Sequence, residues 1–372
     1  MKKGAERKPF WGEKVIDNRW MNIAPLSAER MRQWRADMAS SLVRDARNRV
    51  TGIHHADRNV VALKGLEGIC NIVPEFDVLA RPYQEILDLK FNYKYFARLC
   101  DSLCEKGYIQ NGNLQALPYD FRRVLDPDFR NAFFDEMHEM VEGLSKNHGD
   151  RPVVIVAHSL GGVLFKWFLT VRTTKKWRSK FIKRFILVNP PFGGSTMALK
   201  ALLSGEYYVP IFSKQFHSSL QLNSGIIMCL PNYLGYLPNE PLATIDAEKA
   251  VLTIENLTLR PGDAFDVWRD LYLPHLSTSI MEPSDVPAHI VMCEPVVDTL
   301  QRFRIRDVGR GDVEETGFEA GDGQVSARSL NVAQTLFDSS TTLITTIDNS
   351  HHINCVSDPR LARLVIQDAQ ME

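Results

Sequence analysis

The middle of the chain alternates between two spacings of apolar residues, which predict helices and strands in turn. Apolar residues recur every three to four positions over 92–108 and 131–149, and this spacing predicts two amphipathic helices. Short apolar, β-branched runs at 153–157 and 184–189 predict strands, the first of them buried on both faces. The stretch 113–123 is predicted as a strand followed by a turn. Because strands that alternate with helices are typical of a parallel sheet, we expect an α/β fold.

The periodicity breaks between about Pro190 and Pro287, where Pro, Gly, Ser and Tyr are frequent. A long irregular insertion at the carboxyl end of a sheet is usually functional, so this segment is predicted to form a cap or lid. The core then resumes with strands at 289–295 and 342–347 and a closing helix. The predicted organisation is one domain made of an N-terminal segment packed on the core, a first core part, the cap and a second core part: 1–84, 85–190, 191–287 and 288–372.

The predicted strand 153–157 runs into the sequence "AHSLGG", which places Ser159 where a strand turns sharply into a helix. This fits the G-x-S-x-G nucleophile elbow, with Ala157 in place of the first glycine and Gly161 as the last. Such a turn holds a serine hydroxyl at the top of the sheet. It also directs the backbone N–H of Leu160 toward a developing oxyanion. The alternative is an idle serine in a strand-to-helix loop.

A serine nucleophile needs a base, and two later segments offer an acid and a base in the order typical of this architecture. Asp322 stands between two glycines, and His351 and His352 follow a predicted strand. His352 would take the serine proton and return it to the leaving group, while Asp322 would orient the imidazole and stabilise its charged form. The alternatives are a turn or helix-capping aspartate and a surface histidine.

Composition and charge narrow the class of protein. The 372 residues suit one large α/β domain with insertions or two domains, and the net charge of −1 gives no indication of a nucleic-acid partner. No apolar run reaches the roughly eighteen residues of a transmembrane helix, and no secretory signal opens the chain. A cytoplasmic or peripheral membrane location is therefore expected. The cysteines form no C-x-x-C pair, and neither a metal nor a cofactor is predicted.

Six stretches, in order, resemble the lecithin:cholesterol acyltransferase-like family, which includes phospholipid:diacylglycerol acyltransferases and lysosomal phospholipase A2-type enzymes. The resemblance runs from about residue 15 to the C-terminus and is weakest in the cap. The matching stretches are "VIDNRWMNIAP", "GYIQNGNLQALPYDFRR", "VVIVAHSLGGVLFKWFL", "RFILVNPPFGGS", "GDGQVSARSL" and "HHINCVSDP".

The resemblance implies an α/β-hydrolase core with a cap. It also implies a serine-dependent phospholipase or O-acyltransferase that acts on acyl esters of phospholipids at a membrane or lipid surface. An acyl-enzyme would transfer its chain to water, a sterol or a diacylglycerol. Neither a cofactor nor a metal is implied.

The resemblance also assigns residues around the serine. The family's GDGTV motif looks like 321–325, and its His-Ile segment favours His352 over His351. Its tyrosine-aspartate-tryptophan-arginine motif looks like 119–122, with Phe121 in place of the tryptophan. An ion pair would hold a loop beside the site, unless this is only a structural turn. The proline-tryptophan-glycine-glycine motif looks like 191–194 and would begin the cap. The residues expected to line the pocket or support the site are Tyr119, Asp120, Arg122, His158, Pro191, Phe192 and Gly193.

One expected part of the family's core has no counterpart in the sequence. Family members carry an apolar strand and a Pro-Gly-rich loop before the segment matched by "VIDNRW", and that loop supplies a second oxyanion N–H. Only about fourteen residues precede Val15, and they contain no such strand. A missing oxyanion donor costs about a hundredfold in turnover. Three interpretations stay open: a truncated chain, an unrelated segment that donates the N–H, or a catalytically impaired lipid-binding or interaction protein. A separate alternative is an esterase of soluble esters, with the same triad and a smaller, more polar pocket.

Overall fold

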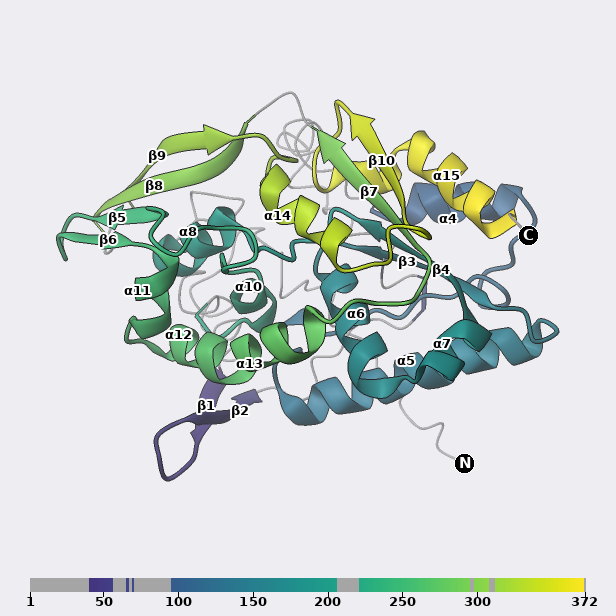
Figure 1. Cartoon of the computed structure of the whole chain (residues 1–372), viewed down its shortest axis with the longest axis horizontal. Helices are drawn as coiled ribbons and strands as arrows, with labels where there is room; N and C mark the ends of the chain where they lie inside the picture. Colours follow the sequence, from purple (N-terminus) through teal and green to yellow (C-terminus); the bar gives the residue numbers. More distant parts are fainter. Residues whose placement is uncertain are drawn as a thin grey trace, which may run out of the picture.

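The computed structural model describes residues 40–55, 65–66, 69, 95–205, 221–294, 298–307 and 312–370. Its core is a four-stranded sheet in the order β10–β7–β4–β3, with every neighbouring pair parallel (Figure 1). The strands are β3 (Val153–His158), β4 (Ile182–Val188), β7 (Ala288–Glu294) and β10 (Leu343–Asp348). The predicted α/β class is confirmed, and the strands predicted at 184–189, 289–295 and 342–347 are present within two residues of their expected ends.

Helices cover both faces of this sheet, because successive side chains of an inner strand point to opposite sides. Phe185 and Leu187 of β4 belong to the apolar cluster on one face. Ile186 and Val188 belong to the cluster on the other face. The covering helices are α5 (Pro127–Asn147), α6 (Leu160–Arg172) and α7 (Lys175–Phe181) on the first face, and α4 (Ala97–Glu105) and α15 (Pro359–Gln370) on the second.

Helix α5 begins four residues before the periodic pattern predicted. The side chain of Asp126 accepts a hydrogen bond from the N–H of Asp128 (3.1 Å), and Pro127 occupies the first helical position. Both features favour a helix start at this point, because the side chain satisfies an N–H that the helix leaves unpaired and proline needs no such partner.

Two expectations, one for β3 and one for the stretch 113–123, are wrong. Strand β3 is half-buried along its length and is not buried on both faces. The stretch 113–123 forms no strand. It runs extended, with one isolated bridge between Gln110 and Leu114, and ends in the short 3-10 helix η2 (Phe121–Arg123). Within the described ranges, β3 pairs with β4 alone and the stretch 113–123 pairs with no strand.

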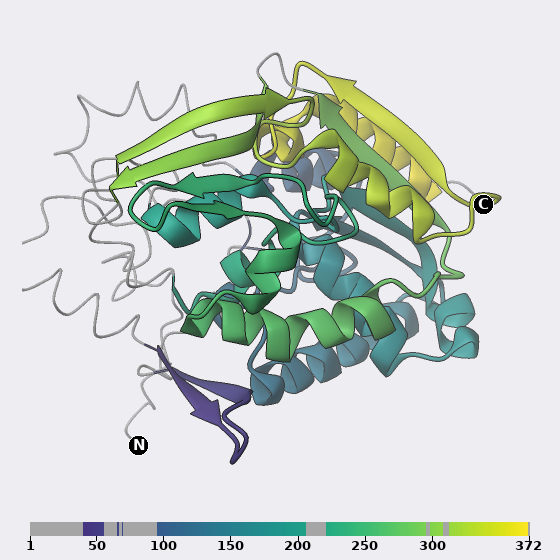
Figure 2. The same ribbon diagram turned by 60° about the vertical axis from the view of Figure 1, so that its left-hand side comes forward.

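The cap contains a second sheet, in the order β6–β5–β8–β9, and this sheet changes the predicted boundary. Strands β5 (Ala243–Ile245) and β6 (Ala250–Leu252) come from the predicted cap. Strands β8 (Thr299–Asp307) and β9 (Asp312–Glu319) lie beyond residue 288, where the core was expected to resume. Yet β8 pairs with β5 and β9 pairs with β8, so both belong to the cap sheet and not to the core sheet. After β7 the chain therefore returns to the cap for two strands before it rejoins the core (Figure 2).

Short helices make up most of the remaining structure. Those of the cap are α8 (Thr196–Ser204), α10 (Ser224–Met228), α11 (Ile254–Leu259), α12 (Asp263–Val267), the π-helical turn η4 (Trp268–Tyr272), α13 (Leu273–His275) and the π-helical turn η5 (Leu276–Ile280). Later in the chain follow α14 (Ala327–Asn331), the 3-10 helix η6 (Val332–Thr335) and the 3-10 helix η7 (Asn354–Ser357).

The N-terminal hairpin of β1 (Ser40–Arg44) and β2 (Val50–His55) packs on the cap. Arg44 forms ion pairs with Asp263 (2.8 Å) and Asp266 (2.6 Å) of α12. Most of the predicted N-terminal segment 1–84 lies outside the described residues. Among the residues that the structure describes, no helix is both long and apolar enough to cross a membrane.

Candidate active site

Ser159 lies at the turn between β3 and α6 with a backbone conformation that L-residues seldom adopt (φ 53°, ψ −128°). Such a conformation costs on the order of 1–3 kcal/mol and persists only where the surroundings hold it. The Ser159 N–H donates to the carbonyl of Val188 (2.8 Å), which fixes the turn to β4. Small neighbours fit the turn, since a Cβ added at Gly161 would lie 3.8 Å from that of Ala157, an ordinary contact. Alanine in place of the first glycine of the motif is therefore accommodated.

Three side chains that are distant in the sequence are hydrogen-bonded in series at this turn. His352 Nε2 lies 2.8 Å from Ser159 Oγ, and His352 Nδ1 lies 2.5 Å from Asp322 Oδ2. His352 and Asp322 are buried. Leu160 is the first residue of α6, so its N–H has no acceptor within the helix and is available to a group beside Ser159.

The two carboxylate oxygens of Asp322 have separate partners. Oδ1 accepts the N–H groups of Gln324 (3.0 Å) and Val325 (2.8 Å), which is the turn geometry that the sequence offered as an alternative. Oδ2 is thereby directed at His352. The loops that carry the two residues are also joined through their backbones, since the N–H of His352 donates to the carbonyl of Asp322 (2.8 Å). Gly321 leaves no room for a side chain, because an added Cβ would lie 2.4 Å from the carbonyl oxygen of Val325.

The side chain of His158 holds the backbone of His352 in place. Its Nε2 lies 2.7 Å from the carbonyl oxygen of His352, and its Nδ1 is hydrogen-bonded to the hydroxyl of Tyr95. Burial, together with the nearby His352 side chain, lowers the pKa of His158 well below its usual value. The ring is therefore neutral, with Nε2–H donating to the carbonyl and Nδ1 accepting from the tyrosine.

The motif at 119–122 lies next to the elbow. Asp120 and Arg122 form a buried two-point ion pair, Oδ1 to Nε at 2.8 Å and Oδ2 to Nη2 at 2.5 Å. The Tyr119 ring packs on Phe133, with centroids 5.2 Å apart, and its hydroxyl lies 3.9 Å from where a Cβ of Gly161 would be. Burial raises the pKa of Tyr119, so the hydroxyl keeps its proton. The ion pair thus holds a tyrosine over the first turn of α6.

Comparisons with known proteins give a family match over the part of the chain that contains the elbow. The family model described as Lecithin:cholesterol acyltransferase matches residues 76–234. Over these residues the chain is similar to the lecithin:cholesterol acyltransferase family. This confirms the resemblance seen in the sequence.

Curated proteins similar to this chain include the dog lysosomal phospholipase A and acyltransferase, which is 36% identical over 30% of this chain and 26% of that protein. The Arabidopsis thaliana lecithin-cholesterol acyltransferase-like 1 is 34% identical over 30% and 27%. The human phosphatidylcholine-sterol acyltransferase is 32% identical over 35% and 29%. The matches therefore span between a quarter and a third of the relatives' own length.

Solved structures with a similar chain course include the Tle4–Tli4 complex, with a TM-score of 0.43 and 12% identity over 66% of this chain and 65% of that one. They also include the Bacillus licheniformis lipase BlEst2, with a TM-score of 0.34 and 10% identity over 72% and 83%. The parallel core sheet and the elbow at Ser159 are those of an α/β-hydrolase core.

The motif at 191–194, which was expected to line the pocket or support the site, lies apart from the apolar pocket beside the Ser159 turn. Phe192 is fully buried in the main core, and the backbone of Gly193 crosses Gly235 so closely that an added Cβ would lie 2.7 Å from its Cα. Asn232 donates to the carbonyl of Phe192 (2.9 Å) from the cap. Neither these residues nor Pro191 line the pocket beside the elbow. In the structure they join core and cap.

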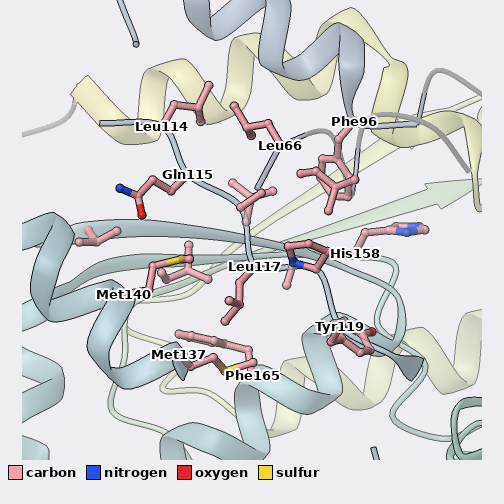
Figure 3. Close-up of a pocket in the computed structure, with 18 of the residues that line it drawn as sticks. Leu66, Phe96, Leu114, Gln115, Leu117, Tyr119, Met137, Met140, His158 and Phe165 are labelled. Atoms are coloured by element: carbon pink, nitrogen blue, oxygen red, sulfur yellow. The ribbon is translucent and has the colours of Figure 1, made fainter. Parts of the chain in front are cut away.

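A pocket of 440 Å³ lies beside the elbow and is lined mainly by apolar side chains (Figure 3). His158, Tyr119 and Gly161 form the end near the turn. From there the pocket extends between α4 on one side and α5 and α6 on the other, to Leu144 near the end of α5.

Two hydrogen bonds near the site, one to His158 and one to His352, escaped the sequence analysis. Tyr95 precedes α4, 63 positions before its partner His158, and no local motif signals that pairing. Cys355 donates its S–H to the carbonyl of His352 (3.0 Å) and follows it by three residues. That spacing was visible in the sequence, but a buried cysteine is usually an apolar core residue.

Replacing Gly194 by alanine is expected to destabilise the fold by about 2–4 kcal/mol. Gly194 has φ 83°, and an added Cβ would lie 2.1 Å from the carbonyl oxygen of Leu230, so backbone strain and a backbone clash add up. Urea denaturation of the variant measures the loss. Gly143→Ala in α5 is the matched control, since nothing lies within 4 Å of its Cβ position and alanine favours a helix. Equal stability of both variants would contradict the close crossing at Gly194.

Proposed function

We propose that this chain is a serine-dependent lipid acyl hydrolase or O-acyltransferase. The observation that carries the proposal is the hydrogen-bonded series from Ser159 through His352 to Asp322 at a strand-to-helix elbow. This arrangement supplies a nucleophile, a general base and a group that orients the base, which is the set that acyl transfer requires.

In the first half of the reaction, the Ser159 hydroxyl attacks the ester carbonyl while its proton passes to His352 Nε2. The carbonyl oxygen becomes an oxyanion, and the N–H of Leu160 at the positive end of α6 stabilises it. The tetrahedral intermediate collapses, His352 returns the proton to the departing alcohol oxygen, and the acyl chain stays on Ser159. Asp322 stabilises the positive imidazolium that forms on the way.

In the second half, the acceptor occupies the place of the departed alcohol. His352 takes its proton, and the acceptor oxygen attacks the acyl-enzyme. Collapse of the second tetrahedral intermediate restores Ser159. Water as acceptor gives a fatty acid, and a sterol or diacylglycerol gives a new ester. The chemistry at Ser159 is the same for both.

The proposed substrate is the acyl ester of a phospholipid at a lipid surface. Support comes from the names of the relatives, a lysosomal phospholipase A and acyltransferase and a phosphatidylcholine-sterol acyltransferase, matched over part of the chain. The assay compares turnover of two substrates. One is phosphatidylcholine with a labelled acyl chain in vesicles, with and without cholesterol or diacylglycerol, and the other is p-nitrophenyl butyrate. Ser159→Ala serves as the blank.

The three candidate functions give different results in this assay. Labelled fatty acid or acyl ester from vesicles, lost in Ser159→Ala, is the expected result. Turnover of the butyrate ester alone would identify an esterase of soluble esters. Saturable vesicle binding without any product would favour an impaired lipid-binding protein and overturn the enzymatic proposal.

His158 acts on this reaction as a positioning residue. Its replacement by leucine removes an N–H donor from the His352 carbonyl and leaves the Tyr95 hydroxyl without its acceptor. Loss of a buried hydrogen bond of this kind costs about 1–3 kcal/mol, so we expect kcat on p-nitrophenyl butyrate to fall tenfold to a hundredfold, with KM nearly unchanged. Glutamine, whose amide can donate to the same carbonyl, is expected to restore much of kcat. If leucine and glutamine are equally impaired, His158 does not act through this donor.

A further inference from the structure

Asn189 stands directly after β4 and has a backbone conformation that is uncommon for any residue other than glycine. Its φ of 48° lies in the left-handed region, which asparagine adopts more readily than most residues but still at a cost. The residue is fully buried, and its N–H donates to the carbonyl of Val291 in the neighbouring strand β7 (2.9 Å). A strained residue at the edge of the sheet that carries Ser159 is a candidate for a role in the site.

The Asn189 side chain connects β7 to the loop that carries His352. Its Oδ1 accepts from the N–H of Cys293 at the end of β7 (2.8 Å), and its Nδ2 donates to Cys355 Sγ (3.2 Å). The first bond settles which way the amide is turned, because only the amide oxygen can accept from the N–H of Cys293. The NH₂ group therefore faces the thiol.

The Cys355 thiol carries this contact on to His352. Its S–H donates to the His352 carbonyl (3.0 Å). Burial, together with the neighbouring Cys293 thiol, raises the pKa of Cys355 well above its usual value, so the thiol keeps the proton that it donates. The S–H can rotate about the Cβ–Sγ bond, and Cys293 offers it a second acceptor. Because the N–H of Asn189 occupies one side of the sulfur, it favours the rotation that directs the S–H at the carbonyl.

The backbone of His352 is held at both of its polar groups. The carbonyl accepts from His158 Nε2 as well as from Cys355 Sγ, and the N–H donates to the carbonyl of Asp322. In acyl transfer the imidazole must keep Nε2 in line with Ser159 Oγ while it gains and loses a proton. A loop that shifts after loss of one of these donors would move the imidazole away from that line.

We propose that Asn189 is a positioning residue, which holds the His352 backbone through the Cys355 thiol and so keeps the imidazole in line with Ser159. The expected effects on rate rest on the proposed function of the triad. The expected effects on the order of the His352 loop do not.

The test is a double-mutant cycle on the whole chain with p-nitrophenyl butyrate as substrate. Asn189→Gly permits the left-handed backbone and removes both side-chain hydrogen bonds, and Cys355→Ala removes the donor to the His352 carbonyl. Each variant is expected to lower kcat about threefold to tenfold, with KM nearly unchanged, because one neutral hydrogen bond is lost. We expect kcat of the double variant to lie within about twofold of that of Cys355→Ala, since both residues act through one contact.

Two further variants separate positioning from general damage. Cys355→Ser keeps a group that accepts from Asn189 and donates to the His352 carbonyl, and it is expected to retain roughly half or more of the wild-type kcat. Asn48→Gly makes the same exchange at an exposed left-handed asparagine (φ 62°) between β1 and β2. It is expected to leave kcat unchanged.

Hydrogen–deuterium exchange at the His352 amide gives a readout that needs no turnover. We expect this amide to exchange about threefold faster or more in Asn189→Gly and in Cys355→Ala, and at the wild-type rate in Cys355→Ser. A wild-type chain that neither hydrolyses the ester nor is labelled at Ser159 would refute the proposed function, and the exchange rates would still decide on the positioning contact.

Three results would overturn the proposal. Losses of kcat that multiply in the double variant would mean that Asn189 does not act through Cys355. Equal impairment of Cys355→Ser and Cys355→Ala would mean that the donor to the carbonyl is not what matters. Unchanged exchange at His352 in Cys355→Ala would mean that the thiol does not hold the loop. The last two results need no variant of Asn189, so the proposal can fail even where Asn189→Gly does not fold.

Discussion

Ser159→Ala is expected to lower ester turnover on the order of a millionfold and to abolish covalent labelling by a fluorophosphonate. The hydroxyl is the atom to which His352 Nε2 is hydrogen-bonded, and no other described side chain is bonded to that nitrogen. Removal of the nucleophile from such a triad costs nearly all of its catalytic effect. Mass spectrometry of the labelled wild-type chain is expected to locate the adduct on Ser159.

The control for this result is Ser179→Ala, which removes an exposed hydroxyl from α7 and is expected to leave labelling unchanged. A folded wild-type chain that does not react would refute the serine mechanism. Labelling at a different serine would place the nucleophile elsewhere.

Asp322→Asn is expected to lower kcat about ten-thousandfold while the fold is retained. The asparagine carbonyl oxygen can accept from the N–H groups of Gln324 and Val325, as Oδ1 does now, so the turn is kept. Its NH₂ group then faces His352 Nδ1 and donates to it. That favours the imidazole tautomer with the proton on Nε2, which cannot accept the proton of Ser159.

Asp338→Asn separates this effect from a general loss of an aspartate turn. Asp338 is exposed and accepts from the N–H of Ser340 (2.9 Å) in the same kind of turn, but it has no contact with the site. Steady-state kinetics on p-nitrophenyl butyrate and urea denaturation are compared for both variants. If kcat of Asp322→Asn falls no further than its stability explains, Asp322 does not set the tautomer of His352.

Local sequence patterns were enough to predict most strands of the core sheet. The apolar runs that became β4, β7 and β10 are short, β-branched and bounded by turn residues, so their period and length identified them. The elbow was also visible, because a serine between small residues after such a run meets a specific steric need. That Ser159, His352 and Asp322 act together was inferred from chain order and resemblance. Their hydrogen bonds are seen only in the structure.

The features that the sequence did not predict depend on contacts with residues far away in the chain. The segment 113–117 has the apolar content of a strand, but a strand needs a neighbour at its edge, and sequence composition does not report one. β8 and β9 follow a core strand directly, yet β8 pairs with β5, more than 50 positions earlier, and β9 pairs with β8. Tyr95 and His158 meet only because α4 and the end of β3 converge in space.

The return of the chain to the cap between β7 and Asp322 has a consequence for engineering. β9 ends at Glu319, three residues before Asp322, and the hydroxyl of Thr299 at the start of β8 accepts from the N–H of Gly323 (2.8 Å). The loop that carries the acid is thus anchored to the cap sheet. A chimera that exchanges only 191–287 would break the pairing of β5 with β8 and release that anchor. Transplanting a foreign cap without disturbing the alignment of Asp322 with His352 therefore requires that strands 299–319 travel with it.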